Sequence, residues 1–217
     1  MKKRLNISFL KKEAHDFALK ESKHHEQSLF GVTDGKAIGT YLEHKFQNSL
    51  KNKYVYKWGS SAKGIDFPEL GVDIKVTSIR QPQSSCPYKS AKQKIYGLGY
   101  SLLVFVYDKM DDEKTRTGNL NVIHTIYVES SRTGDFQTTT ALRRIIDNSG
   151  NIDDIIAILS EHHLPVDDIQ AKELADEILQ NPPEIGYLTI SNALQWRLQY
   201  SRVIEKAGEI TGIIRVV

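Results

Sequence analysis

Two acidic side chains and one basic side chain are spaced in a way that suits the chemistry of phosphate esters. Asp73 and Lys75 lie two residues apart among alternating apolar residues, and Asp66 precedes Asp73 by seven positions. Because side chains alternate along a β-strand, Asp73 and Lys75 share one face of it. Pro68 and Gly71 allow the preceding segment to turn back, which would bring Asp66 to Asp73.

Two carboxylates that converge repel each other and are costly to bury without a cation. A hard cation that prefers oxygen ligands, such as Mg²⁺, removes that cost. An ammonium group beside it can stabilise charge on a scissile phosphate, or help to position and deprotonate the attacking water. The alternative is that Asp73 and Lys75 are only the solvent-facing side of an edge strand, which is the common origin of an isolated Asp-x-Lys pattern.

The surrounding elements must bring these side chains together. Helical spacing predicts an amphipathic helix over residues 8–24 and a second one over residues 36–50 that is capped by Asp34. Alternating apolar residues predict the strand that carries Val72, Ile74 and Val76. We expect further strands near residues 54–56 and over 102–107 and 120–129, a polar hairpin-like stretch over 108–119, and helices over 89–96, 136–147, 152–159, 166–179 and 189–206.

These elements predict an α/β fold (α+β in some schemes), with a central mixed β-sheet flanked by helices and a mostly helical C-terminal half. A length of 217 residues suits one compact domain. The net charge of +2 neither requires nor excludes a nucleic-acid partner, since clustering of Lys and Arg decides that. The single Cys86 excludes an internal disulfide. No signal peptide or membrane span is predicted, so we expect a cytoplasmic protein without a membrane partner.

The Asp-x-Lys pattern follows a helix in which Glu43 comes one turn after Gly39. An Asp followed by Asp-x-Lys on a strand resembles the PD-(D/E)XK nuclease superfamily. More narrowly, DFPELGVDIK at residues 66–75 resembles the active-site segment of the MutH-type branch, which includes a mismatch-repair nicking endonuclease and related type II restriction enzymes. Residues 35–43 are similar to the helix that precedes that segment in the branch. The resemblance spans about residues 35–107, and Asp73 stands where the MutH branch has Glu.

The resemblance implies that Asp66 and Asp73 ligate Mg²⁺, that Lys75 is catalytic and that Glu43 completes the site; Mn²⁺ is expected to substitute. Glu69 is better explained as a solvent-facing turn carboxylate than as another ligand. The implied fold is restriction-endonuclease-like over residues 1–217, with a catalytic sheet core in 1–130 and helical recognition or dimerisation elements in 131–217.

The implied function is that of a type II restriction endonuclease, which hydrolyses phosphodiester bonds of double-stranded DNA at a short specific sequence with Mg²⁺-activated water. A homodimer would supply the two sites that double-strand cleavage needs. Three alternatives stay open at this point. They are a MutH-like enzyme that nicks one strand, a repair nuclease that recognises DNA structure, and a non-catalytic DNA-binding module with a nuclease fold.

DNA contacts are expected from a basic, acid-free stretch that follows the motif. Its candidate residues are Arg80, Gln81, Gln83, Ser84, Lys89, Lys92, Gln93 and Lys94. Groups able to read bases occur at residues 130–134 and on the expected C-terminal helix, which carries Gln195, Arg197, Gln199 and Arg202. Trp196 and Tyr200 on that helix are expected in the core.

Overall fold

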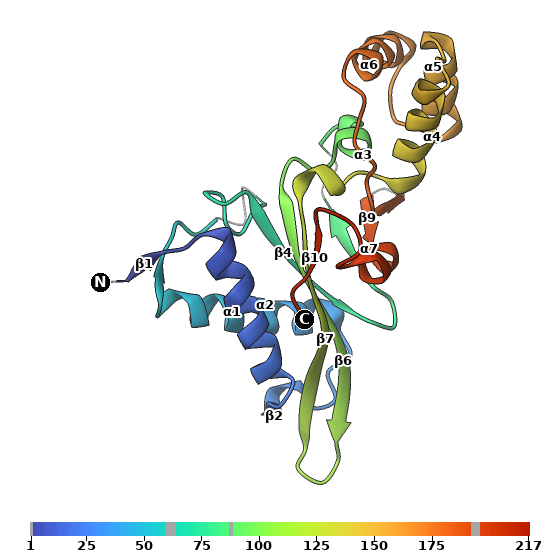
Figure 1. The fold of residues 1–217 in the computed structure, drawn as a ribbon. Helices are drawn as coiled ribbons and strands as arrows, with labels where there is room; N and C mark the ends of the chain where they lie inside the picture. The colour runs from blue at the N-terminus through green and yellow to red at the C-terminus, as the bar shows by residue number, and fades with distance from the viewer. Residues whose placement is uncertain (1, 60–63, 87–88, 192–195) are drawn as a thin grey trace. The chain divides into compact units, whose positions relative to one another are not determined.

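The computed structural model describes residues 2–59, 64–86, 89–191 and 196–217. The chain forms two compact units and passes between them several times (Figure 1). Unit 1 comprises Met1–Ser84, Leu102–Val128 and Lys206–Val217, and unit 2 comprises Ser85–Ser101 and Glu129–Glu205. The candidate catalytic residues therefore belong to unit 1.

Unit 1 is built on a sheet with the strand order β10-β7-β6-β4. These strands are β4 (Val72–Ser78), β6 (Ser101–Asp112), β7 (Thr117–Val128) and β10 (Ile213–Arg215). The hairpin of β6 and β7 is the longest feature of the sheet (Figure 1), and it contains a bulge between Val106 and Tyr107. Residues 108–119, which we expected as a separate polar stretch, mostly continue these two strands.

Two helices cover this sheet. The first, α1 (Ile7–Glu21), packs against β7, and α2 (Gly35–Lys51) packs against β4. The side chain of Asp34 accepts a hydrogen bond from the backbone N–H of Lys36 and so caps α2, as predicted. Rings of Phe17, Phe46 and Phe105 meet in the core beneath the helices, with centroids 5.1–5.9 Å apart. Both predicted helices are confirmed.

Three short strands complete unit 1. The strand β2 (His25–Glu26) pairs with β7 in antiparallel fashion, and β1 (Lys3–Arg4) pairs with β3 (Tyr54–Val55) in parallel. A short 3₁₀ helix, η1 (Gln27–Leu29), follows β2. Antiparallel and parallel pairing thus both occur, and helices flank the sheet, so the predicted α/β (α+β) fold class is confirmed.

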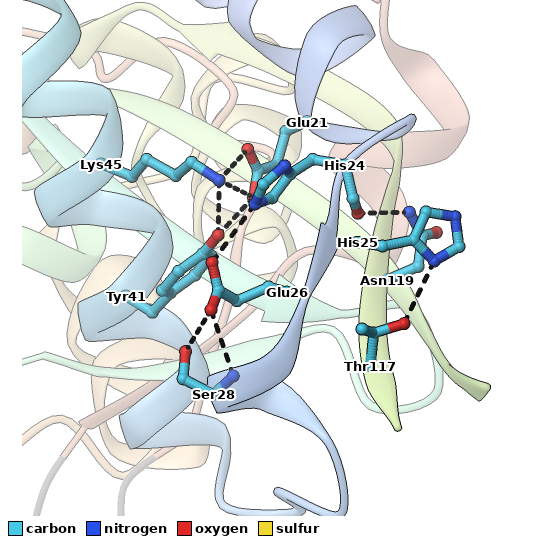
Figure 2. A network of polar contacts seen from close by, with 9 residues as sticks. All are labelled: Glu21, His24, His25, Glu26, Ser28, Tyr41, Lys45, Thr117 and Asn119. Carbon is cyan, nitrogen blue, oxygen red and sulfur yellow. Dashed lines mark hydrogen bonds and ion pairs between the residues drawn. The ribbon is translucent and has the colours of Figure 1, made fainter. Parts of the chain in front are cut away.

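A polar network fixes α2 against α1 (Figure 2). The buried carboxylate of Glu21 accepts hydrogen bonds from the Tyr41 hydroxyl at 3.0 Å and from Lys45 Nζ at 3.1 Å. Beside them, the side chains of His24 and Glu26 are 3.2 Å apart. Burial and the neighbouring Glu21 carboxylate raise the pKa of Tyr41 well above its usual range, so its hydroxyl keeps its proton and remains a donor.

Unit 2 is mainly helical. It contains α3 (Lys92–Tyr96), α4 (Phe136–Asp147), α5 (Ile152–Glu161) and α6 (Asp168–Gln180), preceded by the 3₁₀ helix η2 (Ser130–Arg132). Leu142, Ile155 and Leu174 contribute to its core. The helices predicted over residues 152–159 and 166–179 are confirmed as α5 and α6, and capping boxes begin them at Asn151 and Asp167. A three-stranded sheet has the order β5-β9-β8, from β5 (Gln83–Cys86), β9 (Trp196–Gln199) and β8 (Thr189–Ser191).

The single helix expected over residues 189–206 is wrong. The described part of this region forms β8 and β9 and then a short helix, α7 (Ser201–Lys206), while Gln195 lies outside the described residues. The reason is that buried and exposed side chains alternate along this segment, which is the pattern of a strand and not of a helix. Trp196, Leu198 and Tyr200 are buried, whereas Arg197 and Gln199 are exposed. The core placement expected for Trp196 and Tyr200 is confirmed. No helix in the described ranges is long and apolar enough to cross a membrane.

Candidate active site

A tight turn returns Asp66 to the strand that carries the other candidate residues. Phe67 and Val72 exchange backbone hydrogen bonds, with N–O distances of 2.9 and 3.2 Å, and Gly71 adopts a positive φ of 61° that favours glycine. Phe67 is buried against the rings of Tyr56 and Trp58, which anchors the turn. The expected reversal between Asp66 and Asp73 therefore exists.

The Asp66 carboxylate sits directly beside β4. Its Oδ2 accepts a hydrogen bond from the backbone N–H of Ile74 at 2.7 Å. Burial, together with a hydrogen bond to Asp73 and the charge of Asp73, raises the pKa of Asp66 to about 8, although the Ile74 N–H opposes the shift. A carboxyl with this raised pKa is largely protonated at neutral pH when no cation compensates the nearby negative charge.

Asp73 and Lys75 point to the same side of β4, and that side is not a solvated face. Asp73 is only 5 % exposed, and the exposed fraction of the Lys75 side chain is 18 %. Asp73 Oδ2 lies 2.7 Å from Lys75 Nζ, which makes an ion pair. The orientation of that contact falls short of a hydrogen bond, and Asp73 Oδ2 has no hydrogen-bond partner within the described ranges. The geometry therefore argues against the interpretation of Asp73 and Lys75 as a solvent-facing pair.

Glu43 approaches the acid pair from α2. This helix packs closely on β4, because a Cβ atom placed on Gly39 would lie 3.8 Å from Cβ of Val76. The charge of Glu43 contributes to the raised pKa of Asp66. The buried side chain of Gln47 donates from Nε2 to Glu43 Oε1 at 3.0 Å and so orients the carboxylate. We did not single out Gln47 in the sequence, although its i+4 spacing from Glu43 puts both on one helix face.

The donors present fit a hard divalent cation. Asp66 and Asp73 offer carboxylate oxygens, which Mg²⁺ prefers, and the buried Asp73 Oδ2 accepts no hydrogen bond from the part of the chain that the structure describes. Among the residues that the structure describes, no three His, Cys, Asp or Glu side chains are grouped closely enough to hold a metal. The geometry thus brings together the carboxylates of Asp66 and Asp73, and among the described residues Glu43 does not form a three-acid group with them.

Glu69 occupies the exposed part of the same turn. Its carboxylate is 3.6 Å from the guanidinium of Arg4, and both side chains are solvent-accessible. This is the position expected of a turn carboxylate.

The residues expected to bind DNA differ in accessibility. Arg80 is largely exposed and lies 3.9 Å from Asp108, and Gln81 and Lys89 are also exposed. Gln83 and Ser84 are half-buried in β5, and Lys92 Nζ forms an ion pair with Glu177 at 2.5 Å.

The two remaining residues, Gln93 and Lys94, are buried. Gln93 bonds the backbone of Lys89 and Leu98 and thereby shapes the chain around α3. Burial lowers the pKa of Lys94, and the nearby charge of Asp135 opposes that change. DNA binding by these residues stays a prediction, and the exposed Arg80, Gln81 and Lys89 are the most accessible to DNA.

Comparison with known proteins identifies the family. The family model described as "Type II restriction enzyme NspV" matches residues 4–215. The type II restriction enzyme NspV of Nostoc sp. (strain ATCC 29411 / PCC 7524) is 62 % identical over 212 residues, which cover 98 % of this chain and 96 % of that protein. No solved structure matches the chain. On the extent of these two matches, the chain belongs to the NspV family of type II restriction enzymes.

Proposed function

We propose that the protein is a Mg²⁺-dependent endonuclease of the PD-(D/E)XK type that cuts both strands of duplex DNA at a short specific sequence. Membership of a type II restriction enzyme family supports the reaction and the substrate. One structural observation carries the site assignment. Asp66 and Asp73 converge at a buried position, and the ammonium group of Lys75 lies beside them on the same strand.

Each side chain has a distinct task in this proposal. Asp66 and Asp73 would hold the cation, and the Ile74 N–H fixes the orientation of the Asp66 carboxylate. Bound there, Mg²⁺ supplies a Lewis acid for a phosphate oxygen and increases the acidity of a coordinated water. Lys75 donates from its ammonium group to the phosphate at which negative charge develops. Its limited exposure strengthens this electrostatic contribution, since solvent screening is reduced.

Glu43 and Gln47 act at the border of the acid pair. Among the described residues, Glu43 does not form a three-acid group with Asp66 and Asp73. In this proposal its role is to orient a water molecule or the Asp66 carboxylate. Gln47 is the positioning residue for Glu43, because it holds one carboxylate oxygen from the next helical turn.

Cleavage of both strands requires two such centres or two successive encounters, so we propose a homodimer as the active form. A supercoiled plasmid with one cleavage site distinguishes this from strand nicking. Early formation of linear DNA supports double-strand cleavage, whereas accumulation of the open circle supports a nicking enzyme.

The test of the function is digestion of a phage genome of known sequence by the purified protein with Mg²⁺. We expect discrete fragments whose ends share one short sequence, and we expect no cleavage in EDTA. Mn²⁺ should restore cleavage, because it accepts the same oxygen ligands. Fragments with random ends, or cuts confined to DNA junctions and ends, would contradict recognition of a sequence.

A further inference from the structure

One face of the three-stranded sheet displays exposed and half-buried polar side chains. Along β9, Arg197 and Gln199 are exposed and point to the same side. In the antiparallel register, Ser191 of β8 lies opposite Arg197, and Thr189 lies opposite Gln199. We call these four residues the recognition face.

The chemistry of the recognition face is that of a surface for base edges. Neither Arg197 nor Gln199 uses its side chain in a hydrogen bond or ion pair with any residue in the described parts of the chain. The described strand residues of β5, β8 and β9 include no acid, so the net charge of these strands comes from the arginine. This charge complements DNA, and the guanidinium and carboxamide groups each provide two parallel hydrogen bonds.

The opposite side of β8 and β9 is packed into the core. Trp196, Leu198 and Ile190 are buried on the opposite side of the two strands. The backbone N–H of Ile190 donates to Asp135 Oδ2 at 2.8 Å. From α7, Arg202 donates to Thr189 Oγ1 at 3.2 Å, so this arginine serves the scaffold.

Two acids, Asp135 and Glu161, lie beside the sheet. A cleft of about 370 Å³ at β8 is lined by Asp135, Glu161 and the two β8 residues of the recognition face, among others. Hydrogen bonds from Thr138 and Ile190 engage the Asp135 carboxylate. Glu161 would repel a phosphate, which favours contact through β9 and disfavours contact along the cleft.

We propose that the recognition face reads base edges in the major groove of DNA, with Arg197 on a guanine and Gln199 on an adenine. This inference rests on the proposed function and adds the residues that determine specificity. Two residues on an antiparallel strand span about 6.8 Å. That distance matches about two base-pair steps, so the two side chains address bases about two positions apart. The hydroxyls of Thr189 and Ser191 bond to either donors or acceptors at the neighbouring bases.

The experiment begins with the wild-type protein and its mapped cleavage sequence. Absence of discrete fragments at this stage would refute the proposed function itself. Given a mapped site, dissociation constants are measured with Ca²⁺ in place of Mg²⁺, for one short duplex that carries the site and one with the site shuffled. Arg143→Ala is the matched control, because Arg143 is a partly exposed arginine on α4 that pairs with Asp147 in its own helix.

Arg197→Ala should weaken binding to the mapped site by about 5- to 150-fold and change binding to the shuffled duplex much less. Arg197→Lys keeps the positive charge but loses the two parallel donors of the guanidinium group. This variant should bind the shuffled duplex like the wild type, but its preference for the mapped site over the shuffled duplex should be lost. Gln199→Ala should resemble Arg197→Ala. Because both side chains are exposed, unchanged thermal unfolding is expected and serves as the check on folding.

Base analogues then test the assignment of each side chain. Replacing one guanine by 7-deazaguanine removes the N7 acceptor, which should weaken wild-type binding at one position and leave Arg197→Ala unaffected there. The same comparison with 7-deazaadenine applies to Gln199→Ala. Equal losses on both duplexes would identify Arg197 as a phosphate contact and overturn the proposal. Unchanged affinities, or variants that respond to every analogue as the wild type does, would also overturn it.

Discussion

Replacing Asp66 by asparagine should stabilise the metal-free protein while removing its activity. The raised pKa of Asp66 means that the folded chain binds a proton which the unfolded chain releases. The unfolding free energy therefore falls as the pH rises from the ordinary pKa of 3.8 to about 8, and this contribution is constant above that value. Asparagine mimics the protonated acid, because its oxygen can accept from the Ile74 N–H and its amide can donate to Asp73.

The size of the effect follows from the pKa difference. Near pH 8 the pH exceeds the ordinary pKa of 3.8 of the unfolded carboxyl by about four units, which bounds the destabilisation at about 6 kcal/mol with about 1.4 kcal/mol per unit. Asp66 is only half-buried, and solvent screening reduces that bound. We therefore expect Asp66→Asn to raise the unfolding free energy by about 1–3 kcal/mol near pH 8, and by close to nothing near pH 4.

Urea unfolding followed by circular dichroism measures this difference across the pH range in EDTA and again with Mg²⁺. Binding of Mg²⁺ to the folded state should stabilise the wild type and not Asp66→Asn. With the metal, the difference in unfolding free energy between the two proteins should therefore shrink or change sign. Glu69→Gln is the control, because it removes an exposed acid from the same turn. A variant Asp66→Asn that is less stable than the wild type near pH 8 in EDTA, or a difference independent of pH, would refute the reasoning.

Three further substitutions test neighbouring parts of the account. Lys75→Met should lower the single-turnover cleavage rate by about 10²–10³-fold with little change in DNA affinity, and a rate near the wild type would remove Lys75 from the reaction. Gln47→Ala should lower the cleavage rate by about tenfold, because it removes the hydrogen bond that orients Glu43. Gln47→Asn should not restore the rate, because the asparagine side chain is too short to reach Glu43. Lys45→Met leaves the buried Glu21 without its ion pair, so chemical denaturation should show a loss of about 1–3 kcal/mol while the activity of the folded fraction is kept.

The sequence was most informative where local signals agree. Asp34 marked the start of α2. Local residue patterns also indicated α5 and α6, and the structure shows that capping boxes at Asn151 and Asp167 begin these helices. The alternation around Asp73 and Lys75 predicted β4 and the shared face of the two side chains, because strand geometry alone determines it. Asp66 was placed correctly since Gly71 supports the turn.

The features that the sequence did not predict depend on contacts between segments that are far apart in the chain. Apolar residues between 189 and 206 also match a helical spacing, so only pairing of Ile190 with Leu198 reveals that the segment forms strands. Pairing of β2 and β10 with β7 likewise joins segments about 90 residues apart. The burial of Gln93 and Lys94 could not be inferred from a polar, basic stretch, because their environment is supplied by unit 2 as a whole.

The central claim is that Asp66, Asp73 and Lys75 form one metal-dependent centre for DNA cleavage. Its most direct test is a Mg²⁺ titration of single-turnover cleavage on a plasmid that carries one mapped site, with the wild type, Asp73→Asn and the control Glu69→Gln. We predict cleavage that saturates with Mg²⁺ for the wild type and the control, and loss of cleavage for Asp73→Asn although the folded variant still binds DNA. Cleavage by Asp73→Asn at the wild-type rate and with the same Mg²⁺ dependence would contradict the claim.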